Sequence, residues 1–300
     1  MKILLTGATG FLGTWLFGEL RGKAHRVLIV RRPESDLRAL RKKFGELEVV
    51  DVDWRTAESP FPDCRDVDVI VHAATDYGRS SSAPTRTFWS NEVFPMWLLG
   101  EAVRSGIKRF VNIDTFFNSD RMRYRYLEAY SLSKRHFQEW GKYCGETEGI
   151  EFINLRLFHL YGPGDRLDKF VPGMVQRCLA GERIELTDGG QKRDFIHVTD
   201  AVAAIRLVLE AKGTGGGGYR AIDLGTGYLR SIRSVAERIN ALCGGKGQLE
   251  FGALPTREGE PMSMCANTAG LESMGWSPSV ELNAGIRTVI DDVREKLKGA

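Results

Sequence analysis

The stretch Lys2-Ile-Leu-Leu-Thr6-Gly7-Ala-Thr-Gly10-Phe-Leu-Gly13 at the start of the chain decides the fold class. Its apolar half predicts a short buried strand, and the residues from Thr14 to Leu20 predict a helix that stops near Gly22. Glycines spaced in this way permit a tight bend, let the backbone approach a pyrophosphate and allow the helix to pack on the strand. Since His25 to Val30 predicts a second strand, we expect a βαβ unit that binds a dinucleotide, with a ligand-free tight turn as the alternative. The turn residues expected at the cofactor are Gly7, Thr9, Gly10, Phe11, Leu12 and Gly13.

Composition is typical of an ordinary soluble globular protein. The 300 residues favour about two domains, and 42% of them are hydrophobic and 27% charged. The net charge of +3 is too small to indicate a nucleic-acid partner. The five cysteines are widely spaced, which predicts reduced thiols without a disulfide framework or a metal site. The chain shows neither a signal peptide nor an apolar run of the roughly 18 residues that span a membrane, so we expect a cytoplasmic protein without a membrane partner.

The second expected strand ends in Val30-Arg31-Arg32-Pro33. An enzyme that uses NAD usually places a carboxylate here for the ribose 2′-hydroxyl, whereas an arginine accommodates the 2′-phosphate of NADP. Glu34 and Asp36 follow too late in the chain to be the first choice for that carboxylate. Arg31 and Arg32 therefore favour NADP(H), with NAD(H) as the alternative. The other interpretation is that both arginines begin a solvated helix that continues through Arg38 to Lys43.

Further expected strands end in residues suited to ligand contact. Leu47 to Val52 ends in a carboxylate, Asp51, that could bond the adenine amino group. Asp66 to His72 is followed by small residues that let the backbone lie against a cofactor, and Arg109 to Asp114 is followed by Thr115. Ligands of open α/β sheets bind at the carboxyl ends of the strands. Further cofactor contacts are therefore expected at Asp51, Val52, Ala73, Ala74, Thr75, Asn91 and Ile113.

The segment Tyr130-Ser-Leu-Ser-Lys134 lies in a run, Leu127 to Trp140, that predicts a helix. Tyr130 and Lys134 would then lie one turn apart on one face. A phenol has an unperturbed pKa of about 10, and a neighbouring ammonium stabilises the phenolate and lowers that pKa. Alone, such a pair is more often a feature of a solvated helix. Together with Thr115 at a strand end and the glycine turn, it favours a proton donor.

A basic and aromatic segment, Arg121-Met-Arg-Tyr-Arg-Tyr126, has a pattern that can stack bases and hold phosphates. It has only three arginines and no further basic stripe follows it, so we expect a loop beside the substrate or a surface loop, and no nucleic acid. His72, His159 and His197 lack metal-ligand spacing, which favours packed or hydrogen-bonding histidines.

Helix caps can be assigned in the second half of the chain. Thr199 or Asp200 is expected to cap a helix from Ala201 to Glu210, and Ser231 a helix that runs to Leu242.

With the glycine turn, Thr115, Tyr130 and Lys134 in register, the chain resembles the extended short-chain dehydrogenases/reductases, the NAD-dependent epimerase/dehydratase family, over essentially its whole length. The resemblance implies a Rossmann-type α/β fold, a doubly wound parallel sheet with a smaller C-terminal α/β substrate domain. It implies a dinucleotide-binding domain at 1–160, with contributions from about 194–227, and a nucleotide-sugar-binding domain mainly at 161–300. The later segments that carry it are Leu155 to Gly164, Arg193 to Val198, Asp223 to Gly227 and Arg257 to Glu260.

A narrower resemblance is to nucleotide-sugar 4-ketoreductases that act on CDP-linked deoxysugars. The resemblance implies NADPH-dependent reduction of the C4 ketone of a CDP-linked 4-keto-6-deoxy or 3,6-dideoxy sugar, as in O-antigen and polysaccharide biosynthesis. The segments that carry it are Val71 to Gly78, Asn112 to Phe117, Ser133 to Phe137, His159 to Asp165, Glu250 to Ala253, Ala266 to Asn267 and Met274 to Trp276.

The resemblance also implies roles for individual residues. Thr115 matches the family's catalytic Ser/Thr, Tyr130 its proton donor and Lys134 the partner of that donor. Arg193 and Arg257 match arginines that hold the diphosphate of the substrate. Leu157 and His159 join the expected cofactor contacts. The expected substrate contacts are Tyr77, Arg79, Thr115, Phe116, His159, Lys169, Phe170, Arg193 and Arg257.

Two departures from the family pattern bear on function. His159 stands where the family usually has an Asn that contacts the substrate. Phe116-Phe117 follows Thr115 where dehydratases of the family have Asp-Glu. Without those acids, water elimination lacks its general acid and base, which argues against a dehydratase.

Alternatives to a reductase stay open at this point. A nucleotide-sugar 4-epimerase with tightly bound NAD uses the same residues. A dinucleotide-sensing protein with a dead active site is the second alternative, although such a protein has no need of the complete set of catalytic residues. A homodimer is expected through the apolar helices Asn91 to Arg104 and Tyr130 to Trp140.

Overall fold

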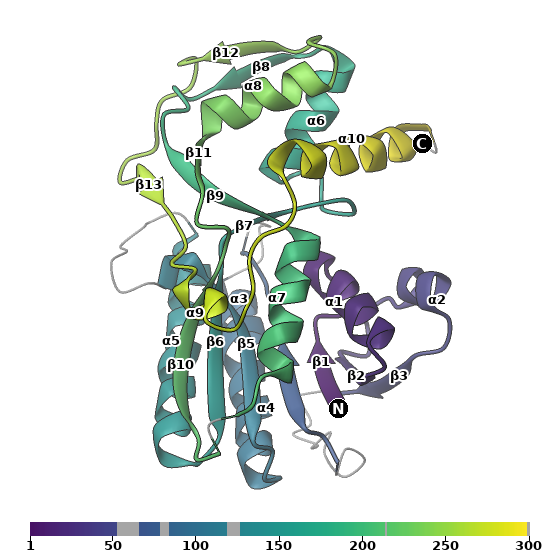
Figure 1. Ribbon diagram of the computed structural model, residues 1–300, viewed down its shortest axis with the longest axis vertical. Coiled ribbons are helices and arrows are strands. Elements are labelled where there is room, and N and C mark those ends of the chain that lie inside the picture. The colour runs from purple at the N-terminus through teal and green to yellow at the C-terminus, as the bar shows by residue number, and fades with distance from the viewer. Residues whose placement is uncertain (53–65, 79–83, 119–126, 214, 299–300) are drawn as a thin grey trace. The chain divides into compact units, whose positions relative to one another are not determined.

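The computed structural model describes residues 1–52, 66–78, 84–118, 127–213 and 215–298. The chain forms two compact units (Figure 1). The first comprises Met1–Leu157 and Val202–Asp223, and the second comprises Phe158–Ala201 and Leu224–Ala300. The predicted substrate contact Arg79, the segment Arg121 to Tyr126 and Cys64 lie outside the described residues.

A seven-stranded sheet forms the centre of the first unit, with the strand order β10-β6-β5-β4-β1-β2-β3. The strand pairs from β6 across to β3 are all parallel. The order runs outward from β1 in two directions, so the predicted doubly wound α/β class is confirmed, and the ends of β1 and β4 flank the point where ligands bind in such sheets. The strands are β1 (Lys2–Thr6), β2 (Arg26–Arg31), β3 (Glu48–Asp51), β4 (Val69–His72), β5 (Arg109–Thr115), β6 (Glu151–Leu157) and β10 (Gly218–Leu224).

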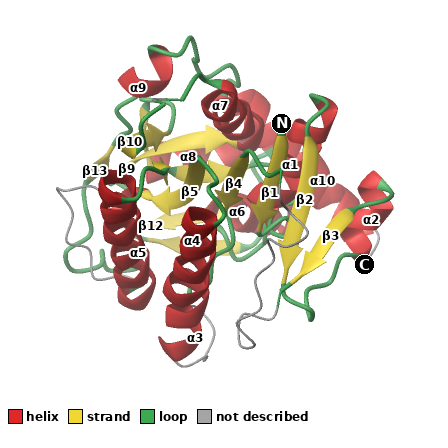
Figure 2. Ribbon diagram, turned by 90° about the horizontal axis from the view of Figure 1, so that it is seen from below, coloured by secondary structure: helices red, strands yellow, loops and turns green. Residues whose placement is uncertain are grey.

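Helices cover both faces of this sheet. Helices α4 and α5 lie side by side over one face, and α1 lies over the other (Figure 2). Throughout the described ranges, no helix is both long and apolar enough to cross a membrane. The helices are α1 (Phe11–Gly22), α2 (Arg38–Phe44), α3 (Pro84–Phe88), the π-helical turn η2 (Trp89–Val93), α4 (Phe94–Arg104), the 3-10 turn η3 (Phe116–Asn118), α5 (Glu128–Thr147) and α7 (Val198–Glu210), which runs from the second unit into the first.

Two of these helices differ from the expected ranges. Helix α1 begins at Phe11 rather than Thr14, because Gly10 is its N-cap and the last glycine of the turn lies inside the helix. The single helix expected from Asn91 to Arg104 is composite, since it begins inside the π-helical turn η2 and continues as α4. Pro95 lies in the first turn of α4. Because proline has no N–H to donate to the preceding turn, a regular α-helix cannot continue across this point.

Helix α5 lies close to the sheet because an aromatic layer fits beneath it. Phe110, Phe152 and Tyr219 stack across β5, β6 and β10, with ring centroids 5.4 and 6.2 Å apart. Phe137 of α5 meets the rings of Phe110 and Phe152 edge-on at 5.9 and 5.7 Å. At Gly141, one turn later, an added Cβ would collide with the Phe152 ring. This contact fixes the distance of α5 from β5 and β6.

Strand β9 is the centre of the second unit and pairs with β7, β11 and β13. Asp194 on β9 is fully buried, and its carboxylate accepts hydrogen bonds from the N–H groups of Thr226, Gly227 and Ala266 at 2.8, 2.8 and 3.2 Å. One side chain thus joins the turn after β10 and the segment after β13 to the central strand. The elements are β7 (His159–Tyr161), α6 (Phe170–Ala180), β8 (Arg183–Leu186), β9 (Lys192–His197), β11 (Leu229–Ser231), α8 (Ile232–Leu242), β12 (Gln248–Phe251), β13 (Ser263–Met264), α9 (Ala269–Glu272) and α10 (Leu282–Lys298).

Of the helix caps expected in this half, the cap of α8 is confirmed. The Ser231 hydroxyl accepts a hydrogen bond from the N–H of Ser234. The cap at Thr199 or Asp200 is wrong, because α7 begins before both residues. The Asp200 carboxylate instead accepts hydrogen bonds from the N–H groups of residues 279–280, at 3.1 and 3.0 Å. It therefore holds the segment that leads into α10.

Gly141→Ala should destabilise the protein, because the added methyl group would overlap the Phe152 ring. Overpacking of a well-packed core typically costs about 1–3 kcal/mol. The matched control is Gly100→Ala on α4, where nothing lies within 4 Å of the new Cβ. There alanine should be equal or better by roughly 0.5–1 kcal/mol, because it is favoured over glycine inside a helix. Urea unfolding measures both, and equal losses at the two positions would contradict the packing explanation.

Candidate active site

The glycine turn joins the end of β1 to α1 and lies against the end of β4. Gly7 has a φ of +73°, and a Cβ there would lie 2.5 Å from the backbone nitrogen of Ala74. A Cβ at Gly13 would collide with the carbonyl oxygen of Gly7. Gly10 is the N-cap of α1 and has no side chain with which to cap it. The first N–H groups of a helix have no partner within the helix, so this cradle fits the diphosphate of a dinucleotide.

The loop after β4 is anchored to β1. The Oγ1 atom of Thr6 accepts a hydrogen bond from the N–H of Ala74 at 3.3 Å. The same oxygen lies 2.9 Å from Nδ1 of His72, which is buried at the end of β4. The predicted contacts Ala73, Ala74 and Thr75 therefore lie beside the glycine turn, at the carboxyl edge of the sheet.

Asn91, on η2, fixes the rest of this loop and is 0% exposed. Its Oδ1 atom accepts hydrogen bonds from the N–H of Asp76 at 2.8 Å and from the hydroxyl of Thr75 at 3.3 Å. Its Nδ2 atom donates to the carbonyl of Asp76 at 2.8 Å and to the hydroxyl of Ser133, on α5, at 3.2 Å. These bonds use the full capacity of a carboxamide. Asn91 thus positions the loop, and its direct contact with a cofactor stays a prediction.

Arg31 and Asp51 bind each other at the ends of β2 and β3, where they are register partners. The Nε atom of Arg31 lies 2.6 Å from a carboxylate oxygen of Asp51, and its Nη1 atom donates to the carbonyl of Ser35 at 2.6 Å. The sequence treats these residues as separate ligands of phosphate and adenine, whereas the structure joins them in one ion pair. Arg31 ends β2 and α2 begins only at Arg38, so the alternative of a helix starting at Arg31 is wrong.

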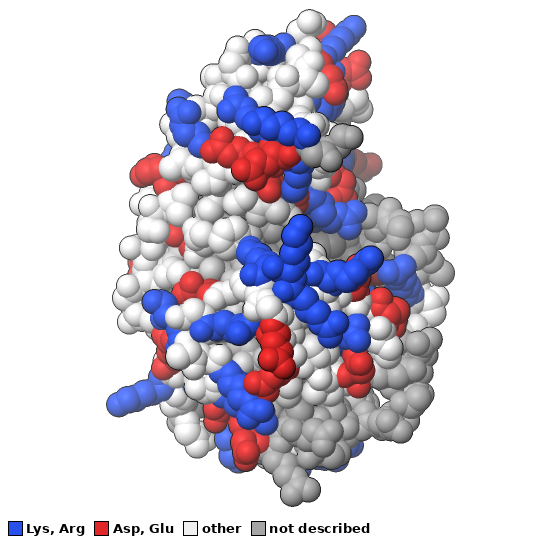
Figure 3. Space-filling model, turned by 90° about the vertical axis from the view of Figure 1, so that its right-hand side faces the viewer, with Lys and Arg blue, Asp and Glu red and all other residues white. Residues whose placement is uncertain are grey.

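Arg32 is the more available cation of the pair. Its side chain is 44% exposed, and Nε lies 3.6 Å from a carboxylate oxygen of Glu34. An exposed ion pair of this length contributes little to stability, so the guanidinium can turn toward another anion. Figure 3 shows the side of the molecule that carries α2, where basic side chains gather with acidic ones between them.

The predicted catalytic residues lie where α5 meets the carboxyl end of β5. Thr115 is the buried last residue of β5. Lys134 is 2% exposed, and its Nζ atom donates a hydrogen bond to the carbonyl of Ile113 at 2.7 Å. Tyr130 is buried one turn earlier on α5, and its ring stacks on that of Tyr77 with centroids 5.1 Å apart. The loop after β4 therefore reaches the tyrosine as well as the glycine turn.

Burial controls the charges at this site. It lowers the pKa of Lys134 to about 8, against which the carboxylate of Asp114 acts to raise it. Burial, and then the Lys134 ammonium, hold the pKa of His72 well below its usual range. His72 is therefore neutral, and Lys134 titrates close to the pH at which most enzymes work.

The second unit carries the predicted diphosphate ligands. Arg193 is buried on β9, with Nη2 2.7 Å from a carboxylate oxygen of Glu260 and Nη1 donating to the carbonyl of Pro261 at 2.7 Å. The N–H of Glu260 donates to the carbonyl of Arg257 at 3.2 Å. The structure thus brings the turn that carries Arg257 to β9, and the Arg257 side chain is exposed. Their contact with a diphosphate stays a prediction.

His159 begins β7, and its ring lies 5.6 Å from that of Phe195 on β9. Burial first, and then the Arg193 guanidinium, lower the pKa of His159 to about 3. The ring is therefore neutral, with one donor and one acceptor nitrogen, which is chemistry that an asparagine amide also offers. His159 thus has one donor and one acceptor at the position where the family usually has an Asn, and its contact with a ligand stays a prediction.

The remaining predicted contacts lie next to the ends of β3, β5 and β6 or at the start of α6, and their contact with ligands stays a prediction. They are Val52, buried just after β3; Phe116, buried in η3; Leu157, at the end of β6; Lys169, the N-cap of α6; and Phe170, the first residue of α6.

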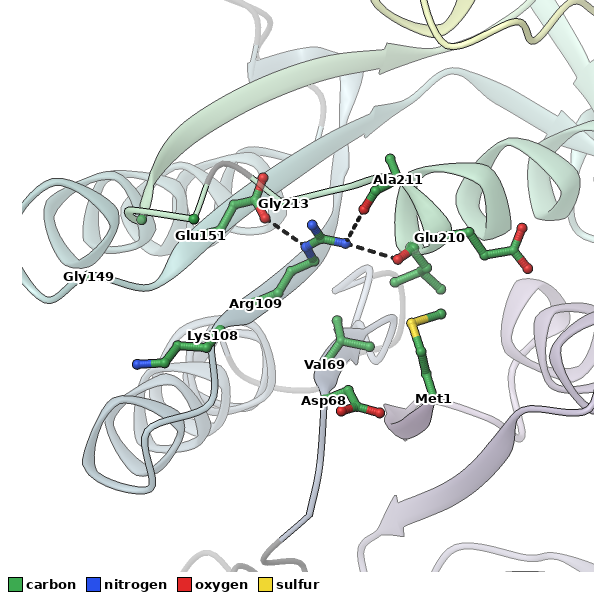
Figure 4. Close-up of a pocket in the computed structure, with 13 residues that line it drawn as sticks. Met1, Asp68, Val69, Lys108, Arg109, Gly149, Glu151, Glu210, Ala211 and Gly213 are labelled. Carbon is green, nitrogen blue, oxygen red and sulfur yellow. Dashed lines mark hydrogen bonds and ion pairs between the residues drawn. The ribbon is translucent and has the colours of Figure 1, made fainter.

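A pocket of about 620 Å³ lies at the other edge of the sheet, around the amino ends of β4, β5 and β6 (Figure 4). Arg109 donates to Glu151 at 2.7 Å and to the carbonyls of Leu209 and Ala211 at 2.9 and 3.0 Å. These contacts join the ends of β5, β6 and α7. Because its buried charges are paired with each other and lie away from the carboxyl edge, we regard this pocket as structural.

Metal chemistry has no visible support among the residues that the structure describes. They contain no group of three or more His, Cys, Asp or Glu side chains that could hold a metal ion. Cys144, Cys178 and Cys243 are free thiols.

Sequence reasoning missed a polar network beneath the site. Asp114 accepts hydrogen bonds from Nδ2 of Asn118 at 3.0 Å and from Nδ2 of Asn154 at 2.6 Å, and all three residues are buried. A signal was present, because Asn112 and Asp114 alternate along β5, a strand where both faces should be apolar. Buried polar residues need partners. Those partners could not be named without the strand register.

Comparison with known proteins places this geometry in a family. Residues 3–225 match the NAD dependent epimerase/dehydratase family, and the chain belongs to that family, as its sequence predicts. Over 290 residues it is 32% identical to the CDP-abequose synthase of Salmonella muenchen, covering 96% of this chain and 97% of that protein. This similarity agrees with the narrower resemblance seen in the sequence.

Solved structures confirm the fold. The UDP-glucose 4-epimerase of Thermotoga maritima, solved with UDP-glucose, has a TM-score of 0.85 at 21% identity and covers 99% of this chain and 100% of its own. The UDP-glucuronic acid 4-epimerase of Bacillus cereus, solved with UDP-glucuronic acid and NAD, has a TM-score of 0.83 at 22% identity, with the same coverage of 99% and 100%.

Proposed function

We propose that this protein reduces the C4 ketone of a nucleotide-linked sugar with NADPH, and that the substrate is a CDP-linked 4-keto-6-deoxy or 3,6-dideoxy sugar. The observation that carries the proposal is the buried Lys134 ammonium bonded to β5 beside Thr115, with Tyr130 one turn away on α5. The similarity to CDP-abequose synthase supports the substrate class. Phe116, in place of a dehydratase acid, supports reduction over water elimination.

The dinucleotide, held by the glycine cradle and the loop after β4, supplies the hydride when it is bound. Thr115 and Tyr130 hydrogen-bond the C4 carbonyl oxygen through their hydroxyl groups. Tyr130 then gives its proton to this oxygen as it becomes an alkoxide. The Lys134 ammonium stabilises the phenolate that remains. Such proton transfer typically contributes about 10²–10⁴-fold to the rate.

The diphosphate of the substrate is assigned to the second unit. Arg257 is exposed and can present its guanidinium fork to a phosphate in two bonds. Arg193 is held by Glu260, and through this pair it also positions the turn that carries Arg257. His159 offers a neutral donor and acceptor next to Arg193.

A nucleotide-sugar 4-epimerase is the second candidate, because structural relatives with the same fold carry that name. An epimerase returns the hydride to its substrate, so it retains NAD through purification and works without added cofactor. A sensor with a dead site is less favoured, since Thr115, Tyr130 and Lys134 are all present.

Tyr130→Phe tests the proton donor. The variant keeps the ring that stacks on Tyr77 and removes only the hydroxyl, so NADPH binding should persist while kcat falls by roughly 10²–10⁴-fold. Activity is followed as NADPH consumption with CDP-, UDP-, dTDP- and GDP-linked 4-ketosugars, and NMR gives the product stereochemistry. Tyr228→Phe, at an exposed position of the second unit, is the control. If Tyr130→Phe kept a kcat near that of the wild type, the role of Tyr130 as proton donor would be disproved. If the wild-type protein were purified with bound NAD and turned over its substrate without added cofactor, the epimerase would be favoured.

Arg32→Ala tests the preference for NADPH. We propose that Arg32 holds the 2′-phosphate, beside the Arg31–Asp51 pair. Loss of one charge-assisted hydrogen bond costs about 1.5–3 kcal/mol, which corresponds to a loss of roughly 10–100-fold in NADPH affinity and leaves NADH affinity unchanged. Titration of cofactor fluorescence measures both constants. Arg38→Ala, whose guanidinium binds Asp36 on the surface, is the control. An equal loss of affinity for NADPH and NADH would show that Arg32 does not bind the 2′-phosphate.

We also propose that two copies of the chain pair through the outer face of α5. Leu132, Trp140 and Tyr143 are exposed on α5, and Phe88 and Trp89 are exposed on the adjoining α3–η2 segment. A gathered exposed patch of this kind marks an interaction surface, and aromatic residues are enriched at such surfaces.

Trp140→Glu should convert the dimer to a monomer, because a charge at the centre of an apolar interface is left without a partner. Sedimentation velocity measures the mass. Tyr228→Glu, at an exposed aromatic of the second unit, should leave the dimer intact. A wild-type protein that sediments as a monomer at all concentrations would refute the proposal.

A further inference from the structure

Asp114 carries a carboxylate that the proposed chemistry does not use. It is 3% exposed and directly precedes Thr115 on β5. The cost of burying a charged carboxylate is large unless it is hydrogen-bonded and paired. At this position the structure supplies both a set of donors and a cation.

The donors are oriented toward an ionised carboxylate. Nδ2 of Asn112 donates to Oδ1 of Asn154 at 2.7 Å, so the Nδ2 of Asn154 is directed at Oδ2 of Asp114. Nδ2 of Asn118 is directed at Oδ1 of Asp114. Both carboxylate oxygens accept N–H bonds, as a carboxylate does and a protonated acid cannot fully do. The geometry therefore favours a charged Asp114, although burial raises its pKa.

The cation is Lys134 on α5, whose buried Nζ atom donates to the carbonyl of Ile113, the residue before Asp114, at 2.7 Å. From there it acts electrostatically on Asp114. The other basic group on this face is Arg156, the register partner of Asp114 on β6, and its Nε lies 2.6 Å from a carboxylate oxygen of Asp223. Arg156 is thus neutralised by its own partner. Lys134 and Asp114 are left as the opposite charges that compensate each other.

Two further titratable groups that border the pair, Tyr219 and His72, are neutral. Burial, and then the charge of Asp114, raise the pKa of Tyr219 on β10 to about 12. His72 on β4 stays uncharged, because burial and then the Lys134 ammonium hold its pKa well below the usual range. Tyr219 and His72 therefore do not contribute to the pH response at neutral and moderately alkaline pH, which is left to the pair and to Tyr130, the proton donor it supports.

We propose that Asp114 is a positioning residue of the reduction, and that its negative charge keeps Lys134 protonated so that the ammonium can support proton donation by Tyr130. The inference rests on the proposed function of Lys134 and Tyr130. Asp114 touches neither substrate nor cofactor in this scheme and acts through Lys134 alone.

Asp114→Asn removes the charge and keeps the size of the side chain. The new amide needs one acceptor among its neighbours. The Oδ1 atom of Asn118 is buried and has no hydrogen-bond partner among the described residues, so rotation of that amide can supply the acceptor. Asp114→Ser, which is smaller and also neutral, serves if the first variant does not fold.

The first measurement is the pH profile of kcat/KM. The carboxylate raises the pKa of Lys134, so its removal should move the high-pH limb of the profile to lower pH, by about one unit or more. Asn112→Ser disturbs the same network without changing charge, and its limb should stay at the wild-type pH. An unshifted limb in Asp114→Asn, or an equal shift in both variants, would overturn the proposal.

The second measurement is urea unfolding as a function of pH, which needs no substrate. Burial lowers the pKa of Lys134 from 10.5 to about 8, so over this window the unfolded chain binds more protons and stability rises with pH. In Asp114→Asn the free energy of unfolding should begin to rise at a lower pH than in the wild type. In a Lys134→Met background, Asp114→Asn should no longer change this part of the curve.

The two measurements separate the inference from the function on which it rests. Superimposable stability curves for wild type and Asp114→Asn would overturn the pairing of Asp114 with Lys134, whatever the substrate. A shifted stability curve with an unshifted kcat/KM limb would overturn its role in the reduction. A wild type that reduces none of the ketosugars would overturn the function, while the stability curves would still show whether the charges are coupled.

Discussion

The hydrogen bond from the Lys134 ammonium to the Ile113 carbonyl joins α5 to the strand that ends in Thr115, and it does so inside the protein. A buried ammonium is tolerated only where its lost hydration is replaced. The carbonyl replaces part of it, and the charge of the Asp114 carboxylate acts in the same direction through space. Because this bond is short, the height of α5 above the sheet has to be fixed, and the aromatic layer and Gly141 fix it. Chemistry and packing of the first unit therefore depend on one contact.

The carboxyl edge of the sheet is held together by short polar contacts between segments far apart in the chain. Thr6 binds the loop after β4, and Asn91 binds the same loop and α5. Tyr77, in that loop, stacks on Tyr130. The cradle for the dinucleotide and the tyrosine are thus parts of one rigid arrangement. A rigid site orients the groups before the reaction and avoids the cost of ordering them during it.

Much of this could be predicted from the sequence wherever the physical cause is local. The tight turn after β1 needs glycine because backbone atoms approach within contact distance, and such a need is visible in spacing alone. Tyr130 and Lys134 are paired by helix periodicity. The Arg31–Asp51 pair and the bonds of Asp114 depend on strand register, which a single sequence does not reveal. The Asp200 cap was wrong for a related reason, since its true partners lie about eighty residues later, where no local pattern indicates them.

The four bonds of Asn91 also restrict how this family member can change over evolutionary time. Aspartate offers no N–H to the Asp76 carbonyl, glutamine carries the same amide one methylene further away, and serine has too few hydrogen-bonding atoms. Each of these single replacements would therefore leave buried groups of the loop without their hydrogen-bond partners. Position 91 should consequently resist drift on account of the loop alone. A residue beside an active site can thus be restricted by the hydrogen bonds that a loop needs, independently of the substrate.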